Sequence, residues 1–155
     1  MDVRHVHQSD PLVQPLLRDL EQEYTGRYGR LFESLVGYPA ERFAPPDGAF
    51  LLLLEEGEAV AGGAFQKYAP DTAELKRIWT HRDHRRRGLA ARVVAELEKE
   101  AAGRGYTRMV LTTGPRQPEA RGLYLALDYT PLFDVDADTS EWRRPLPFEK
   151  SLLPS

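Results

Sequence analysis

Positive charge is concentrated in residues 81–100, HRDHRRRGLAARVVAELEKE, directly before an apolar, Ala-rich run. Arg85, Arg86 and Arg87 precede Gly88, which lets the backbone approach an anion because glycine has no Cβ. Main-chain N–H groups at a helix N-terminus bind phosphate groups, and arginines there oppose the helix dipole unless an anion is bound. The segment therefore indicates a phosphate or pyrophosphate site, although the spacing alone leaves a solvated basic turn open.

The expected elements place this segment between a strand and a helix. Alternating and apolar runs predict strands over 3–7, 50–55, 59–68, 74–80, 108–113, 130–136 and 146–152. Helical spacing predicts helices over 11–24, 21–35 with a break near Gly26 and Gly29, and 118–127. A further helix begins near Gly88, with an apolar stripe of Leu89, Val93, Val94, Leu97 and Ala101. This order predicts an α/β fold with a mixed, mostly antiparallel sheet flanked by helices.

Length and composition restrict the class of protein. The 155 residues, 41% hydrophobic and 29% charged, predict one domain over residues 1–155 with a sizeable core. The net charge of -3 argues against a nucleic-acid partner, because such domains are usually basic overall. With no cysteine, disulfides and thiolate nucleophiles are excluded. The longest apolar run, residues 49–54, is too short to cross a membrane, so we expect a cytoplasmic protein with no membrane partner.

Histidines occur in two short groups. His5 and His7 share one face of the first expected strand, and His81 and His84 flank Asp83. The two groups belong to different elements, whereas a metal ion needs three or four ligands at one point. The sequence therefore predicts no metal site.

Two motifs resemble a known family. Residues 85–90, RRRGLA, resemble the (Q/R)xxGx(G/A) pyrophosphate loop of the GNAT acyltransferase superfamily, and ELKRIWT before them is similar to that family's fourth strand. Residues 113–129, TGPRQPEARGLYLALDY, resemble the TG(x)2QPEA(x)2LY(x)2LGY segment of many bacterial members, and FEKSL resembles their last strand. The resemblance covers the chain after Phe50 and implies the GNAT fold.

The resemblance implies an N-acetyltransferase that moves an acetyl group from acetyl-CoA to a primary amine of a small molecule or peptide, within a ternary complex. Main-chain amides over residues 86–91 would hold the coenzyme pyrophosphate, and residues 78–80 would pair with the pantetheine arm beside a bulge. The chain has no asparagine, so Thr113 or Gln117 would replace the family's pantetheine-binding Asn. The implied coenzyme-binding residues are Ile78, Trp79, Thr80, Arg85, Arg86, Arg87, Gly88, Leu89, Ala90, Ala91, Thr113, Gln117 and Tyr124.

The resemblance also implies two catalytic side chains. Glu74 occupies the position of a base carboxylate in related enzymes, acting directly or through water; an ordinary exposed glutamate is the competing interpretation. Strict alternation places Glu74, Lys76, Ile78 and Thr80 on one face of their strand, the side of the acetyl site. Tyr124 resembles the family tyrosine that protonates the departing thiolate, and a core aromatic is the competing interpretation.

Aromatic residues before the sheet are implied to bind the acceptor. Tyr24 and Tyr28 lie one helical turn apart where relatives build the acceptor pocket, and the following loop carries Tyr38 and Phe43. With Glu21, Glu23 and Glu33 nearby, such a wall would suit a cationic amine, although core packing is the commoner role of aromatic residues. The resemblance leaves a homodimer open.

The turn before Tyr129 departs from the family pattern. Asp128 replaces the glycine that usually precedes Tyr129, so we expect a left-handed backbone conformation at Asp128.

The rival to an enzyme is a module that senses acyl-CoA, or binds nucleic acid through its basic segment, without chemistry. A steep salt dependence of oligonucleotide binding would favour the nucleic-acid version.

Overall fold

The structure, a computed structural model, describes residues 1–28, 39–115 and 117–154, and only the main chain of residues 24–28. Seven strands of this described part form one sheet, in the order β1-β2-β3-β4-β5-β7-β6. Neighbouring strands are antiparallel except β4 and β5, which are parallel. The strands are β1 (Asp2–His5), β2 (Ala49–Glu55), β3 (Glu58–Ala69), β4 (Thr72–Thr80), β5 (Arg108–Thr113), β6 (Thr130–Pro131) and β7 (Leu146–Ser151). The predicted mixed α/β sheet is thereby confirmed.

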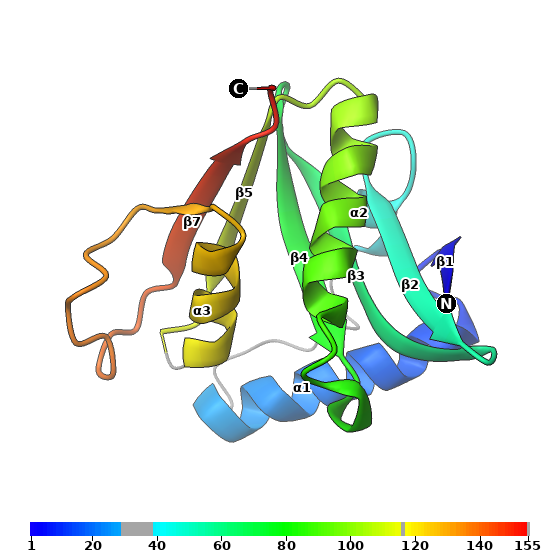
Figure 1. Cartoon of the computed structure of the whole chain (residues 1–155), viewed down its shortest axis with the longest axis horizontal. Helices are drawn as coiled ribbons and strands as arrows, with labels where there is room; N and C mark the ends of the chain where they lie inside the picture. Colours follow the sequence, from blue (N-terminus) through cyan, green and yellow to red (C-terminus); the bar gives the residue numbers. More distant parts are fainter. Residues whose placement is uncertain (29–38, 116, 155) are drawn as a thin grey trace.

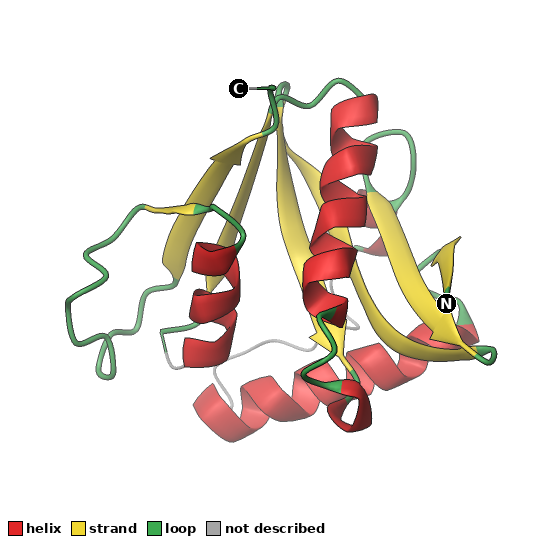
Figure 2. Cartoon of the chain, in the orientation of Figure 1, coloured by secondary structure: helices red, strands yellow, loops and turns green. Residues whose placement is uncertain are grey.

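Helices cover both faces of the sheet. Helices α2 (Leu89–Gly103) and α3 (Pro118–Ala126) lie on one face, and α1 (Gln14–Tyr28) crosses the other face (Figures 1 and 2). Two buried clusters correspond to these faces, one built with α2 and α3 and one with α1. Residues 49–54 of β2 and 60–66 of β3 are buried without interruption because both faces of these strands are covered.

Several predicted boundaries were wrong. Helix α1 begins at Gln14, after a 3-10 turn over Pro11–Val13, and runs without a break through Gly26. The rest of the second predicted helix, residues 29–35, lies outside the described residues. Residues 40–43 of the expected loop form a 3-10 turn, Ala40–Phe43, because Phe43 is buried in the core.

The strand predicted over residues 130–136 was also too long. It ends at Pro131, and the chain then turns where the Asp134 carboxylate accepts a hydrogen bond from the Asp136 N–H (3.0 Å). Asp138 makes the same kind of contact with the Ser140 N–H (2.9 Å). Such local aspartate contacts compete with strand pairing, so this segment folds as a series of turns.

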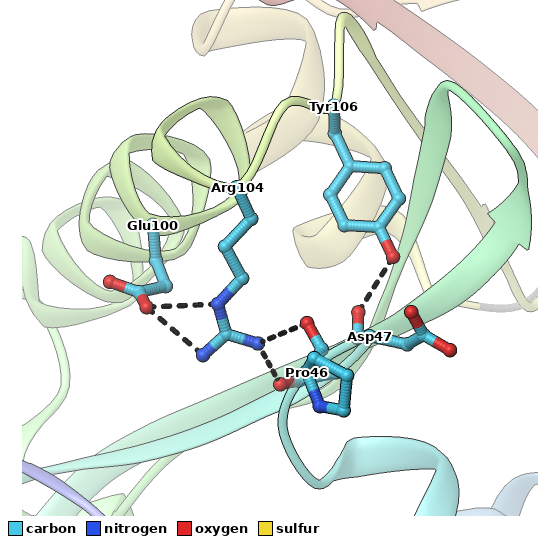
Figure 3. Close-up of polar contacts among 6 residues, drawn as sticks. Pro46, Asp47, Glu100, Arg104 and Tyr106 are labelled. Atoms are coloured by element: carbon cyan, nitrogen blue, oxygen red, sulfur yellow. Dashed lines mark hydrogen bonds and ion pairs between the residues drawn. The ribbon is translucent and has the colours of Figure 1, made fainter.

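The C-terminal end of α2 is tied to the loop before β2. Arg104 pairs with Glu100 (3.0 Å) and donates hydrogen bonds to the carbonyls of Pro46 (3.1 Å) and Gly48 (Figure 3). The Tyr106 hydroxyl donates to the Asp47 carbonyl (2.7 Å), and its ring packs edge-on against Phe65. Burial, and secondarily the charge of Asp47, raises the pKa of Tyr106. These contacts satisfy loop carbonyls that would otherwise lack partners.

Candidate active site

Strands β4 and β5 separate at one end of the sheet. Within the described residues, their parallel ladder joins only residues 72–74 of β4 to residues 108–110 of β5. Strand β4 continues for six residues to Thr80, and Figure 1 shows the two strands diverging toward the N-terminus of α2. Main-chain groups of β4 that face this opening can pair with an extended ligand in the manner of an added strand.

A β-bulge lies in β4 beside the opening. Gly62 pairs with Trp79 and Ala64 with Lys76, so Arg77 and Ile78 together lie opposite the single residue Gly63. Arg77 has φ +64°, a left-handed conformation that costs a non-glycine residue about 1 kcal/mol or more. The bulge implied by the family resemblance is therefore present, and it redirects the main chain from Ile78 onward.

The bulge overturns the expectation that Glu74, Lys76, Ile78 and Thr80 share one face. Ala73 and Leu75 belong to the cluster under α2, so Glu74 and Lys76 point to the α1 face. After the extra residue the alternation reverses, because Ile78 packs against the α2 cluster and Trp79 belongs to the α1 cluster. Ile78 and the carboxylate of Glu74 thus lie on opposite faces of the sheet.

The arginine segment forms a turn that leads into α2. A 3-10 turn over Arg82–His84 is followed by Arg86 with φ +64° and by Gly88 with φ +73°. Gly88 is the N-cap of α2 and supplies no side-chain hydrogen bond to the first turn. A helix leaves its first N–H groups without helical partners, so this end offers donors to an anion. The predicted start of the helix near Gly88 is confirmed.

Arg87 is committed to neighbouring side chains. Its guanidinium pairs with Glu55 at the end of β2 (2.6 Å) and donates to Nδ1 of His84 (2.8 Å). The hydrogen bond from Arg87 lowers the pKa of Glu55. Arg87 therefore joins the basic turn to the β2–β3 hairpin, and Arg85, Arg86 and Arg87 are all exposed.

Glu74 is the last β4 residue paired with β5. Its side chain is 14% exposed and accepts a hydrogen bond from the amide of Gln66 (2.7 Å), and Lys76 lies 4.0 Å from its other oxygen. Glu74 and Ile78 are four positions apart with the bulge between them, and their side chains point to opposite faces of the sheet. A proton transfer from an amine at the bulge to Glu74 would therefore need water.

Tyr124 lies on the same face of the sheet as Ile78. It is 5% exposed, and its ring packs against Tyr129 (5.6 Å between centroids) and Phe148 (5.9 Å). Tyr129 donates its hydroxyl to Glu98 (2.6 Å), and burial together with this hydrogen bond raises the pKa of Tyr129 strongly. Tyr129 is thus held by Glu98, and Tyr124 packs against the rings of Tyr129 and Phe148.

The glutamate that binds Tyr129 also binds a lysine. Lys150 of β7 lies 3.2 Å from Glu98 and donates to the carbonyl of Leu127 (2.9 Å). Asp128, next in the chain, has φ +69°, which confirms the expected left-handed conformation. These contacts fix the turn after α3 and with it the tyrosine pair.

The two candidates for the missing asparagine lie at the end of β5. Thr113 is 6% exposed, and its hydroxyl has no hydrogen-bond partner among the residues that the structure describes. The Gln117 side-chain oxygen accepts a hydrogen bond from the Gly114 N–H (2.8 Å), which stabilises the turn into α3. The structure brings both residues to the end of β5 that diverges from β4.

The proposed acceptor residues are only partly described. Tyr24 and Tyr28 belong to α1, but their side chains, like Tyr38 and Glu33, lie outside the described residues. Phe43 is 2% exposed and packs edge-on against Phe50, so it belongs to the core and not to an acceptor wall.

In the described part of the chain, no group of three His, Cys, Asp or Glu side chains could hold a metal ion. No described helix is long and apolar enough to cross a membrane.

Sequence reasoning missed two residues at the bulge. A Cβ on Gly63 would lie 2.5 Å from the Ile78 side chain and 3.0 Å from Val93, so a larger residue opposite the bulge would force these side chains to shift. The Gly62-Gly63 pair inside a strand was a usable signal, because glycine there often marks a bulge or a close approach. No sequence signal identified Arg77, since arginine is rare in a left-handed conformation.

Comparisons with known proteins agree with this geometry. The model of the acetyltransferase (GNAT) family matches residues 13–129. The uncharacterized N-acetyltransferase YsnE of Bacillus subtilis is 32% identical over 82 residues, which cover 53% of this chain and 54% of that protein. The matched region thus spans about half the length of that curated relative.

Solved structures share the fold. An acetyltransferase of the GNAT family from Staphylococcus aureus superposes with a TM-score of 0.78 at 10% identity, covering 98% of this chain and 100% of that one. An aminoglycoside 6'-N-acetyltransferase complexed with coenzyme A gives 0.70 at 17% identity, covering 100% and 99%. The mixed sheet and its helices therefore have the α/β fold of GNAT-family acetyltransferases. This chain belongs to the acetyltransferase (GNAT) family.

Proposed function

We propose that the chain is an acyl-CoA-dependent N-acyltransferase that transfers acetyl from acetyl-CoA to a primary amine of a small molecule or peptide. The observation that carries the proposal is the opening between β4 and β5, with the bulge at one side and the uncapped start of α2 at its mouth. An extended pantetheine arm fits as a strand in this opening, and the pyrophosphate fits at the N–H groups after Gly88. The relative solved with coenzyme A supports this choice of cosubstrate.

The transfer needs only groups that the site offers. The amine nitrogen attacks the thioester carbon, forming the C–N bond, and the C–S bond breaks as the thiolate departs. Main-chain N–H groups over residues 78–80 polarise the thioester oxygen, as fixed donors stabilise developing negative charge elsewhere. No covalent enzyme intermediate is involved, in keeping with a chain that has no cysteine.

Two proton transfers accompany the step. Tyr124 gives its proton to the departing thiolate, supported by its position on the same face as Ile78. Glu74 takes the proton that the attacking amine loses, through water, because its side chain points to the opposite face of the sheet from Ile78. Glu74→Gln should therefore lower turnover less than Tyr124→Phe.

Thiol release with a panel of amines tests the proposal. Acetyl-CoA is added to the purified chain with small polyamines, amino acids and short peptides, and free thiol is followed. Release that depends on one amine, with a matching acetylated product, is the expected result. Saturable binding with no release for any amine class would favour a module that senses acyl-CoA, and would contradict the enzyme.

A further inference from the structure

Arg77, at the bulge, extends its side chain toward two buried residues. It occupies the left-handed position of the bulge (φ +64°), although glycine would adopt this conformation without strain. Its guanidinium carbon lies 5.3 Å from the centre of the Phe43 ring, and its Nε donates a long hydrogen bond to Oε1 of Gln8 (3.4 Å). Phe43 and Gln8 are 2% and 6% exposed, so the side chain reaches into a packed part of the α1 face.

A second contact anchors the strand just after the bulge. Trp79 is 4% exposed, and its indole N–H donates to Asp19 of α1 (3.0 Å). Arg77 and Trp79 are therefore both attached on the α1 face, on either side of Ile78. Ile78 turns to the other face, into the space that Gly63 leaves by having no Cβ. The main chain at Ile78 is thus fixed from both sides.

We propose that Arg77 is a positioning residue: its clamp between Phe43 and Gln8 holds the main chain of residues 78–80 where the thioester must lie. This inference rests on the proposed function, because the thioester site is part of that function. Phe43 and Gln8 belong to the segments that flank α1, so the clamp connects the bulge to both of these segments. A guanidinium is suited to this role because it stacks on an aromatic ring while donating in its plane.

Three substitutions separate the side chain from the backbone conformation. Arg77→Gly keeps the left-handed conformation and removes the clamp, Arg77→Ala removes the clamp and adds strain, and Arg77→Lys keeps the charge without the planar donor. Arg77→Gly should lower kcat about tenfold or more, with the Kd for acetyl-CoA changed by less than about threefold, because small misplacements of reacting groups are costly. Arg77→Lys should recover part of kcat.

Arg108→Ala is the matched control, since Arg108 is also a strand arginine, paired with Glu149 (3.1 Å), but lies where β4 and β5 remain paired, opposite Thr72. It should leave kcat unchanged. Wild-type kcat in Arg77→Gly would overturn the proposal, because the backbone conformation alone would then suffice. An Arg77→Gly loss no larger than that of Arg108→Ala would overturn it as well.

A readout without activity keeps the test independent of the proposed function. The chain has two tryptophans, so Trp142→Phe leaves Trp79 as the only indole fluorophore. In that background, Arg77→Gly should shift Trp79 emission to longer wavelength, as water reaches the indole, whereas Arg108→Ala should not. An unchanged Trp79 spectrum would overturn the clamp. A wild type without amine-dependent thiol release but with this shift would instead contradict only the proposed function.

Discussion

The two ends of helix α2 differ in how their polar groups are satisfied. At the C-terminal end, Arg104 and Tyr106 donate to the carbonyls of the loop before β2 (Figure 3). At the N-terminal end, Gly88 gives no side-chain cap, and Arg85 stands exposed beside it. The C-terminal end, here called the closed end, is held by contacts within the protein that stabilise the fold. The N-terminal end, here called the open end, leaves its first N–H groups as donors for a ligand. Substitutions at the two ends should therefore separate stability from activity.

The largest effect on turnover is expected for Tyr124. Tyr124→Phe should lower kcat about 100-fold, since general acids contribute on the order of 100-fold or more, with little change in acetyl-CoA affinity. Tyr106→Phe, the same change at the closed end, should leave kcat within about twofold. Steady-state kinetics of both variants make the measurement. An unaltered kcat in Tyr124→Phe would remove this residue from the mechanism and leave it a core aromatic.

The next effect falls on stability. Arg104→Ala should lower the free energy of unfolding by about 2 kcal/mol, because the carbonyls of Pro46 and Gly48 and the carboxylate of Glu100 lose their partner. Arg85→Ala at the open end should change stability by less than about 0.5 kcal/mol and weaken acetyl-CoA binding instead. Denaturant unfolding and calorimetry together test the pair. Equal losses of stability would abolish the distinction between the ends.

A pair of glycines gives the most closely matched comparison. Gly88 and Gly105 flank α2, both have positive φ, and an added Cβ at either would meet nothing within 4 Å. Alanine at each position should cost stability alike, about 1 kcal/mol. Only Gly88→Ala should also weaken acetyl-CoA binding, about tenfold, because the Cβ obstructs the approach of the pyrophosphate. If Gly105→Ala weakened binding as much, the effect would be on folding alone.

The smallest effect concerns the Tyr106 hydroxyl. Tyr106→Phe should cost about 1 kcal/mol near neutral pH, through the lost hydrogen bond to Asp47. The pKa of Tyr106 is raised in the folded state, so its contribution is fully present below the unfolded value of about 10 and is lost as the pH rises through the folded pKa. Unfolding measured between neutral and strongly alkaline pH should thus show a steeper decline for wild type than for Tyr106→Phe. Parallel profiles would refute this assignment.

The sequence predicted the start of α2 better than it predicted which side chains of β4 share a face. Glycine before an apolar stripe marked the start of α2, since both signals are local. The faces of β4 were wrongly predicted, because one extra residue at Arg77 reverses the alternation and the sequence signal for it, Gly62-Gly63, lies in the neighbouring strand. The contacts of Arg104 and Tyr106 with residues 46–48 join segments more than fifty residues apart, which only packing decides. The roles of Glu74, Tyr124, Tyr24 and Tyr28, the single domain and the cytoplasmic location stay predictions.

The central claim is that the open end of α2 and the gap beside β4 bind an acyl-CoA. Calorimetric titration of wild-type protein with acetyl-CoA tests it most directly, with Gly88→Ala titrated in parallel. The account predicts saturable binding of one acetyl-CoA per chain and about tenfold weaker binding by the variant. Absence of binding to a folded wild-type chain, or equal binding by both proteins, would contradict it.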